Sequence, residues 1–219
     1  MSHEHPDHDP DDVSSFYSQE TWDARYAESS RVWSGNPNPL LVEHAADLAP
    51  GTALDVGCGE GADAVWLATQ GWRVTALDVS EVALARTAQH ARESGVEDRV
   101  EGVHVDLIDG EAIPGRFDLV SMQFLHPPQA MFDALHQRVG EAVAPGGRLL
   151  VVGHHPDDLE TGVRRPHGPA LLFTPEQVVA ALGTDDWQIL VADAPSRQHS
   201  GPDGPVTVRD SVVVAVRCS

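Results

Sequence analysis

The sequence predicts an α/β protein with a doubly wound parallel sheet and helices on both faces. From residue 52 onward, short apolar segments alternate with longer segments of helical periodicity. The apolar segments are nearly continuous rather than alternating with polar residues, which is typical of parallel strands buried on both faces. The last two apolar segments are separated by a polar loop containing Gly and Pro, which predicts an antiparallel pair near the end of the sequence.

Each predicted strand is an apolar run bounded by turn residues. The predicted strands are residues 52–57, 72–80, 99–107, 116–125, 147–155, 187–194 and 211–217. The predicted helices between them are residues 62–70, 81–94, 129–143 and 174–183. Ser80 is placed to cap the second of these helices, and Thr174 followed by Pro175 is placed to open the last. Ligands of such sheets bind beyond the carboxyl ends of the strands, so the loops that follow the strands are candidates for a site.

The N-terminal part divides into two segments. Residues 1–15 are acidic and rich in His, which predicts a disordered tail in which His3, His5 and His8 bind metal weakly if at all. Residues 16–50 predict a helical lid, with helices over 16–28 and 40–48 separated by the break at 34–39. Residues 51–219 then form the main domain.

Charge and composition exclude several function classes. The chain has 219 residues and a formal net charge of −20. It contains no Lys, so Arg supplies all 14 of its Lys-or-Arg residues. A field of this sign disfavours nucleic acid and anionic membranes, so a small-molecule partner is expected. The sequence has no apolar run of the roughly 18–20 residues that a membrane span needs and no signal peptide, which favours a cytoplasmic protein. Cys58 and Cys218 are expected to be free thiols, and no metal site is predicted.

The stretch LDVGCGEG, residues 54–61, carries glycines at 57, 59 and 61 directly after the first strand. Glycines permit unusual dihedral angles and let a ligand approach the main chain. The same residues satisfy the G-x-G-x-x-G/A pattern of dinucleotide-binding folds. Glu60 disfavours that alternative, because a carboxylate near a helix start repels a pyrophosphate.

Two further acids end neighbouring strands. Asp78 ends the second strand, where it can accept hydrogen bonds from ribose hydroxyls, although dinucleotide-binding folds also have this acid. Asp106 and Leu107 end the third strand, where a carboxylate and a main-chain N–H can recognise an adenine edge.

With these motifs, the chain resembles the class I S-adenosylmethionine-dependent methyltransferases over about residues 20–155. The matching motifs, in order, are LDVGCGEG, ALDVS, VHVDL, RFDLVSMQFLHP and APGGRLLVV. The resemblance implies a Rossmann-like, seven-stranded sheet whose last strand is antiparallel. It also implies S-adenosyl-L-methionine as the cofactor.

The resemblance implies roles for individual residues. The amino-acid end of the cofactor is assigned to Asp55 and the main chain of the glycine loop, that is Gly57, Cys58, Gly59 and Gly61. The adenosyl end is assigned to Asp78, Val79, Asp106 and Leu107, and the methionine portion to Met122 or Gln123. Cys58 is expected to be a small residue that fits the loop rather than a nucleophile. Alternatively, Asp55 caps the loop, Asp78 caps a helix, and Asp106 is a solvated strand end.

Histidines cluster where the acceptor is expected. His126 follows the fourth strand, His154 and His155 follow the fifth, and His167 lies in the next loop. An imidazole of near-neutral pKa suits proton transfer, and the alternative for each is loop packing. The Arg pair at 164–165 either binds a substrate carboxylate or faces solvent.

The segment before the first strand resembles the lid of thiopurine and tellurite-resistance type methyltransferases, which act on small, soft nucleophiles. Arg25 or Tyr26 is expected to contact the cofactor carboxylate, and Trp33 to cover the methyl region. Alternatively, Trp22 and Trp33 are core anchors of helix packing. A thiol or a metalloid is therefore one acceptor class to test.

Three functions are compared on this basis. The first is a methyltransferase for a small molecule, and the second is a non-catalytic sensor of S-adenosylmethionine or its demethylated product. The third is a nicotinamide oxidoreductase. The residues SMQF at 121–124 stand where base-methylating enzymes carry an N-P-P-Y-type tetrapeptide, which argues against DNA methylation. The sequence gives no expectation for the oligomeric state.

Overall fold

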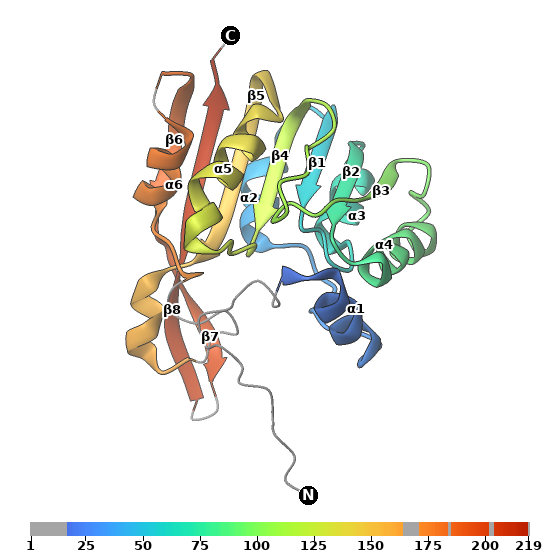
Figure 1. Cartoon of the computed structure of the whole chain (residues 1–219), viewed down its shortest axis with the longest axis horizontal. Helices are drawn as coiled ribbons and strands as arrows, with labels where there is room; N and C mark the ends of the chain where they lie inside the picture. Colours follow the sequence, from blue (N-terminus) through green and yellow to red (C-terminus); the bar gives the residue numbers. More distant parts are fainter. Residues whose placement is uncertain (1–16, 164–170, 184, 202–203, 219) are drawn as a thin grey trace, which may run out of the picture.

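The computed structural model describes residues 17–163, 171–183, 185–201 and 204–218. Its centre is a sheet with the strand order β3-β2-β1-β4-β5-β8-β6 (Figure 1). The strands are β1 (Thr52–Val56), β2 (Arg73–Asp78), β3 (Val100–His104), β4 (Phe117–Gln123), β5 (Val143–His154), β6 (Trp187–Asp193) and β8 (Gly204–Arg217). Of these, β8 alone runs antiparallel to its neighbours β5 and β6. The predicted Rossmann-like sheet is confirmed.

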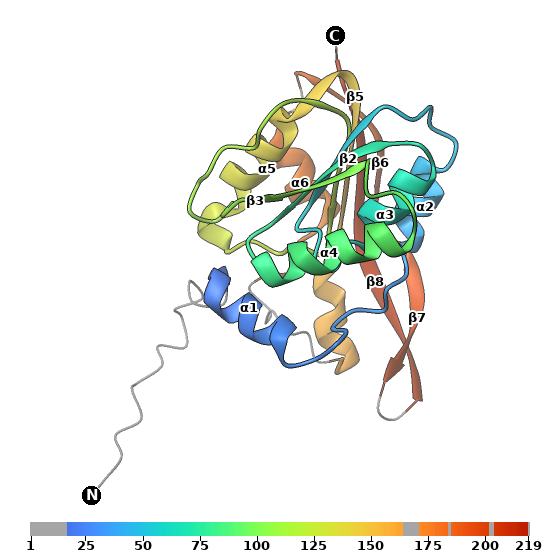
Figure 2. The same cartoon turned by 90° about the vertical axis from the view of Figure 1, so that its right-hand side faces the viewer.

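Helices cover both faces of the sheet (Figures 1 and 2). The helices α5 (Phe132–Glu141) and α6 (Pro175–Leu182) pack on one face, and α2 (Pro39–Ala45), α3 (Ala62–Thr69) and α4 (Glu81–Glu93) pack on the other. Alternation along β1 divides the core, because Leu54 and Val56 face the first group while Ala53 faces the second. The strand order reverses between β1 and β4, so the loops after these two strands flank the switch point where ligands of such sheets bind.

Local chemistry sets several helix ends as predicted. The Ser80 side chain accepts a hydrogen bond from the main-chain N–H of Ala83 at the start of α4. Thr174 and Gln177 form a capping box at the start of α6, and Pro175 occupies its first turn. The predicted helix over 129–143 begins instead as a 3-10 turn, η2 (Gln129–Met131), and then continues as α5.

An additional strand, β7 (Ser196–Gly201), pairs with the first half of β8 and extends that corner beyond the main sheet (Figure 1). The sequence predicts a polar loop here, because residues 196–201 contain no apolar run. Its side chains are largely polar, and main-chain pairing with β8 holds it in place. The predicted antiparallel pair is present, since β6 and β8 are hydrogen-bonded neighbours.

The N-terminal segment lies across the carboxyl ends of the parallel strands. Helix α1 (Gln19–Ala27) packs against α4 below the sheet edge, as the two views show (Figures 1 and 2). The predicted tail over 1–15 lies outside the described residues. In the part of the chain that is described, no helix is long and apolar enough to cross a membrane.

Candidate functional site

The loop after β1 needs its glycines for three different reasons. Gly57, Gly59 and Gly61 all have positive φ, at 71°, 54° and 78°. A Cβ on Gly61 would lie 2.6 Å from the Thr87 side chain, so this glycine allows the loop to pack on α4. A Cβ on Gly59 would lie 3.0 Å from the Tyr26 hydroxyl, whereas one on Gly57 would meet nothing closer than 3.6 Å. Only Gly57 therefore leaves room beside its main chain.

Cys58 is a packing residue, as the sequence analysis expected. Its side chain is buried, with Sγ 3.8 Å from the Thr87 hydroxyl. The same hydroxyl donates to the Gly59 carbonyl at 2.9 Å. Burial raises the pKa of the Cys58 thiol, so the neutral, poorly nucleophilic form is favoured.

Asp78 joins the glycine loop to the start of α4. One carboxylate oxygen accepts from the Gly59 N–H at 2.8 Å, and the other accepts from the Ser80 N–H at 2.9 Å. Burial raises its pKa, although these main-chain bonds oppose the shift. Val79 lies beside it and is half-buried. Asp78 therefore combines the predicted position at the strand end with the alternative capping role.

Two more carboxyls are buried beside the loop. Asp55 is 2% exposed, and its Oδ2 has no hydrogen-bond partner among the residues that the structure describes. Burial raises the pKa of Asp55 well above its ordinary value, and the charges of Asp63 and Asp78 add to the effect. Burial likewise raises the pKa of Asp63 to about 6, although the Asn38 N–H donates to it at 2.6 Å. A positively charged group placed here would relieve the repulsion among these acids.

Asp106 lies in a turn rather than at a strand end, because β3 already ends at His104. Its Oδ1 accepts from the main-chain N–H groups of Ile108 and Asp109, at 2.9 and 3.0 Å. Leu107 is buried, and its carbonyl accepts from the Arg138 guanidinium. The turn that carries Asp106 and Leu107 is thus held at both ends by polar contacts.

The structure separates the two candidates at the end of β4. Met122 is fully buried in the core under α5, so it does not face the strand-end loops. Gln123 lies at the end of the strand, where its Oε1 accepts from the Asn38 side chain at 2.8 Å. Gln123 is therefore the better candidate for contact with a ligand.

Glu60 fastens the N-terminal segment to the glycine loop. Its carboxylate accepts from the main-chain N–H groups of Val32, at 3.1 Å, and Trp33, at 2.9 Å. The Arg86 guanidinium lies 2.6 Å from the same carboxylate and also donates to the Tyr26 and Ser29 carbonyls. No pattern in the sequence indicates this contact, because Glu60 and its partners lie 26 to 28 residues apart in the chain.

The aromatic residues of the lid stack around Arg25. Its guanidinium lies 5.0 Å from the Trp22 ring and 5.2 Å from the Trp33 ring. The Trp33 indole N–H donates to the Tyr26 hydroxyl at 2.9 Å. Trp33 is 41% exposed, which excludes it as a core anchor and fits a lid residue.

The three proposed catalytic histidines fall into different environments. His126 is 1% exposed, and its Nε2 accepts from the His154 main-chain N–H at 2.9 Å, so this nitrogen carries no proton and its lone pair is occupied. The His126 carbonyl accepts from the Tyr17 hydroxyl of the N-terminal segment. His126 is therefore a structural residue, and its expected role as a proton acceptor is corrected.

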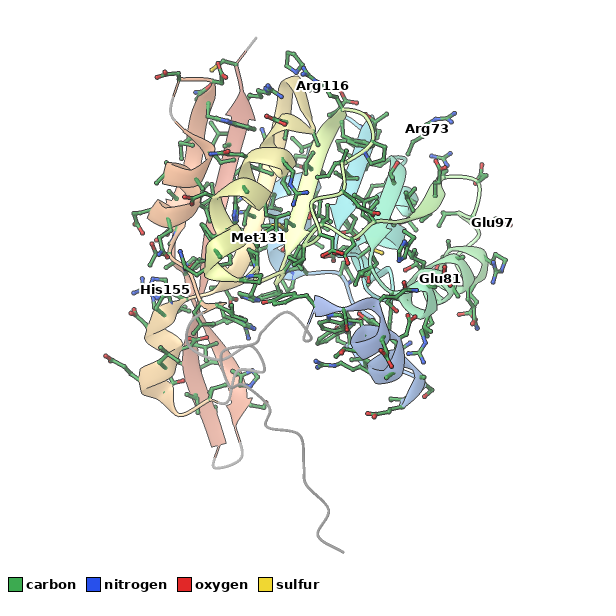
Figure 3. All side chains as sticks on the ribbon, viewed as in Figure 1. Arg73, Glu81, Glu97, Arg116, Met131 and His155 are labelled. Atoms are coloured by element: carbon green, nitrogen blue, oxygen red, sulfur yellow. The ribbon has the colours of Figure 1, made fainter. Side chains whose placement is uncertain are left out.

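His155 is also corrected. It lies at the edge of the molecule opposite α1 (Figure 3), where its Nδ1 accepts from the Asp157 N–H at 3.1 Å and caps η3 (Pro156–Thr161). Strand β5 ends at His154, whereas His155 stands at the start of η3, where its Nδ1 also lies 3.4 Å from the Asp157 carboxylate. The predicted contributions of His167 and of Arg164 and Arg165 lie outside the described residues.

His154 lies at the end of β5, among aromatic rings. Its ring stacks on that of His126, with centroids 5.0 Å apart, and packs against Phe124 at 4.6 Å. Its Nδ1 lies 3.7 Å from the Asp210 carboxylate. Asp210 is not predicted from the sequence, because its contact with His154 depends on the register of β5 with β8. Within the described ranges, no three His, Cys, Asp or Glu side chains are grouped so that they could hold a metal ion.

Comparison with known proteins agrees with this geometry. Residues 53–147 match the family model described as a methyltransferase domain. A ubiquinone biosynthesis O-methyltransferase of Azotobacter vinelandii is 37% identical over 120 residues, which are 52% of this chain and 50% of that protein. The ribosomal RNA small subunit methyltransferase C of Alcanivorax borkumensis is 34% identical over 113 residues, 48% of this chain and 33% of that protein. The chain thus spans about half or less of the length of these curated relatives.

Solved structures match more of the chain at lower identity. TehB from Haemophilus influenzae superposes with a TM-score of 0.69 at 17% identity, covering 92% of this chain and 67% of that one. The complex of DhpI with SAH superposes with a TM-score of 0.61 at 24% identity, covering 93% of this chain and 96% of that one. These similarities establish the fold.

Proposed function

Because this chain belongs to the class I S-adenosylmethionine-dependent methyltransferases, with its methyltransferase domain at residues 53–147, we propose that it transfers a methyl group from that cofactor to a small molecule. The observation that carries the proposal is the contact between the Gly59 N–H and the Asp78 carboxylate. It brings the glycine loop and the acid of the second strand together at the switch point.

The residues present fit the cofactor. Asp55 has a buried carboxylate oxygen without a described partner, and its neighbours Asp63 and Asp78 are acidic. The cofactor carries two positive groups, an ammonium and a sulfonium. Positive charge beside these three acids would offset their mutual repulsion. Beside the Gly57 main chain there is room for at least a Cβ, which would make only ordinary van der Waals contact with Leu125, at 3.6 Å.

We assign the binding residues accordingly. Asp55 and the main chain of Gly57 would hold the amino-acid end, whereas the N–H of Gly59 is already bonded to Asp78 and its carbonyl to Thr87. Asp78 would accept from the ribose diol, since each of its oxygens retains a second lone pair beside its main-chain bond. The adenine end is assigned to Val79, Asp106 and Leu107, and the methionine portion to Gln123.

Catalysis here depends mainly on positioning and on the exclusion of water. When bound, the cofactor supplies a methyl group on a sulfonium sulfur, which departs with the electron pair of the broken C–S bond. The lid residues Trp33 and Tyr26 lie over Gly59, and Glu60 holds them there. This arrangement would keep water from the donor end of the site.

The acceptor class is the finer part of the proposal. A thiol, a metalloid or another soft nucleophile is one candidate, from the resemblance of the lid. A hydroxyl compound is the other, and relatives named O-methyltransferases support it. A ribosomal RNA methyltransferase is also similar, but the net charge of −20 disfavours RNA as a substrate. The alternative function is a non-catalytic sensor of the cofactor or its demethylated product.

Two measurements test the proposal. Titration calorimetry with S-adenosylhomocysteine and, separately, with NAD and NADP should give saturable binding for the first compound only. Incubation with labelled S-adenosylmethionine and a panel of thiols, metalloid oxyanions and phenols should then give a methylated product. Binding without any product would favour the sensor, and binding of a nicotinamide nucleotide alone would overturn the cofactor assignment.

A further inference from the structure

Three polar side chains lie in a row from β7 to the end of β5, namely Arg197, Asp210 and His154. We refer to this row as the relay. Asp210, on β8, is 2% exposed and is the register partner of His154 on β5. Its Oδ1 lies 3.7 Å from His154 Nδ1, which is longer than a hydrogen bond and close enough for an ion pair once the ring is protonated. Arg197, on β7, reaches the same carboxylate with two groups, its Nε on Oδ2 and its Nη2 on Oδ1 at 3.1 Å.

His154 lies one short segment away from the glycine loop. Its ring packs on Phe124, which is held at a φ of 54° with its N–H donating to the Val152 carbonyl at 2.7 Å. Leu125, the next residue, packs beside Gly57. A non-glycine residue at positive φ directly after β4 is the kind of strain that accumulates at functional sites. His154 therefore lies beside the loop after β4, which borders Gly57, and 13% of its side chain remains exposed.

The charges around the ring suit a proton acceptor. The titratable and charged side chains placed against His154 in the described part are His126, Asp210 and, through Asp210, Arg197. Burial alone would raise the pKa of Asp210, but its contacts with His154 and Arg197 lower it, so this carboxylate is ionised at neutral pH. Its negative charge, 3.7 Å from Nδ1, would stabilise the imidazolium formed when Nε2 takes a proton.

We propose that His154 is the general base of the transfer, that Asp210 and Arg197 position it, and that the acceptor is a hydroxyl compound rather than a thiol or metalloid. The inference rests on the proposed function and names its substrate class. As the acceptor oxygen forms the C–O bond and the C–S bond of the donor breaks, the hydroxyl proton passes to His154 Nε2. The imidazolium then releases that proton to water, and His154 is restored.

The choice of acceptor follows from what such a base is needed for. A thiol has an ordinary pKa near 8.5 and is partly ionised at neutral pH, whereas a phenol, like the Tyr side chain, has a pKa near 10. A metalloid oxyanion already carries its reacting lone pair. A hydroxyl acceptor must lose a proton to react, so it is the acceptor class that needs a positioned base. His154, with the Asp210 carboxylate and the Arg197 guanidinium beside it, would be that base.

The first test needs no cofactor. Proton and carbon NMR follows the titration of the His154 ring in the cofactor-free protein, with the signal identified by its loss in His154→Gln. Asp210→Asn should move the titration midpoint to lower pH, because it removes the neighbouring negative charge. Arg197→Gln should move it to higher pH, because it removes a positive charge. Arg197 is 40% exposed, so its variant is expected to fold even if the Asp210 variant does not. An unchanged midpoint in Arg197→Gln, or movement to lower pH, would overturn the relay.

The second test measures transfer by the intact enzyme. His154→Gln should lower the rate with a phenolic acceptor by at least about 100-fold and leave S-adenosylhomocysteine affinity unchanged. His155→Asn, a matched control that keeps a capping side chain, should retain the rate. Intact cofactor binding with transfer to thiols or metalloids only, or an unimpaired His154→Gln, would contradict this inference and leave the proposed function in place. Failure of the wild-type protein to bind S-adenosylhomocysteine or to methylate any acceptor would instead refute the proposed function, and the inference with it.

Discussion

Glu60 accepts a hydrogen bond from the main-chain N–H of Trp33, with 2.9 Å between Oε2 and the nitrogen. This contact joins the glycine loop to a segment 27 residues earlier in the chain. The Arg86 guanidinium, 2.6 Å from the same side chain, joins both to α4. A side chain within the glycine loop thus also holds the N-terminal segment against that loop.

Removing the charge of Glu60 should loosen the lid. In Glu60→Gln the acceptor oxygen remains but the ion pair with Arg86 is lost, at a cost of about 1 kcal/mol. Amide hydrogen exchange at residues 29–33 should then be about fivefold faster, since local opening follows this free energy. Glu28→Gln, at an exposed position next to the same segment, is the control. Equal exchange in Glu60→Gln and the wild type would show that the contact does not hold the lid.

Substituting Asp78 should weaken cofactor binding. Asp78→Ala removes the carboxylate that accepts from Gly59 and that is assigned to the ribose, so the affinity for S-adenosylhomocysteine should fall by about 1–3 kcal/mol. Asp109→Asn changes an exposed acid near the assigned adenine end and should bind as the wild type does. Calorimetry on the three proteins measures the difference, and unchanged affinity in Asp78→Ala would remove this residue from the site.

Asp63 should make the cofactor-free protein less stable as pH rises. Its pKa is raised to about 6 in the folded state, chiefly by burial, so its contribution is fully present below the unfolded pKa of 3.8 and is lost as pH rises through 6. Asp63→Asn should therefore gain stability relative to the wild type between pH 4 and 7, by about 2 kcal/mol. Urea denaturation at a series of pH values measures this gain. A constant difference between the two proteins across that range would contradict the assigned shift.

Gly61 should tolerate no side chain. Gly61→Ala combines a positive φ with a contact of 2.6 Å to Thr87, so it should destabilise the protein by about 3 kcal/mol. Gly95→Ala provides the matched control, because Gly95 has a φ of 67° and nothing within 4 Å of its would-be Cβ. The control should cost about 1 kcal/mol. Equal losses for the two variants in urea denaturation would mean that packing on α4 contributes nothing.

Features set by neighbouring residues could be predicted from the sequence. Ser80 and Thr174 act as caps within one helical turn, and the run of Val and Leu around β5 indicates a buried strand wherever it occurs. The proximity of the glycine loop to Asp78 could also be predicted, because adjacent parallel strands end at one edge of the sheet. The hydrogen bond from the Gly59 N–H to Asp78 itself could not.

Features set by long-range register could not be predicted. Strand β7 carries polar side chains and is held by its pairing with β8, so no local pattern indicates it. Because β7 is not predicted, the contact between Arg197 and Asp210 could not be predicted either. The different environments of His154 and His155 depend on where β5 ends, because His154 is its last residue and His155 caps η3. An error of one residue in the predicted strand end exchanges the two environments.

The central claim is that the loop at residues 57–61 and the acids after β1, β2 and β3 form one binding site for the cofactor. A crystal structure with S-adenosylhomocysteine tests it most directly. The claim predicts the ribose diol on Asp78, the adenine beside Val79 and Asp106, and the amino-acid end along Gly57. A ligand bound elsewhere, or a ribose with no contact to Asp78, would contradict it.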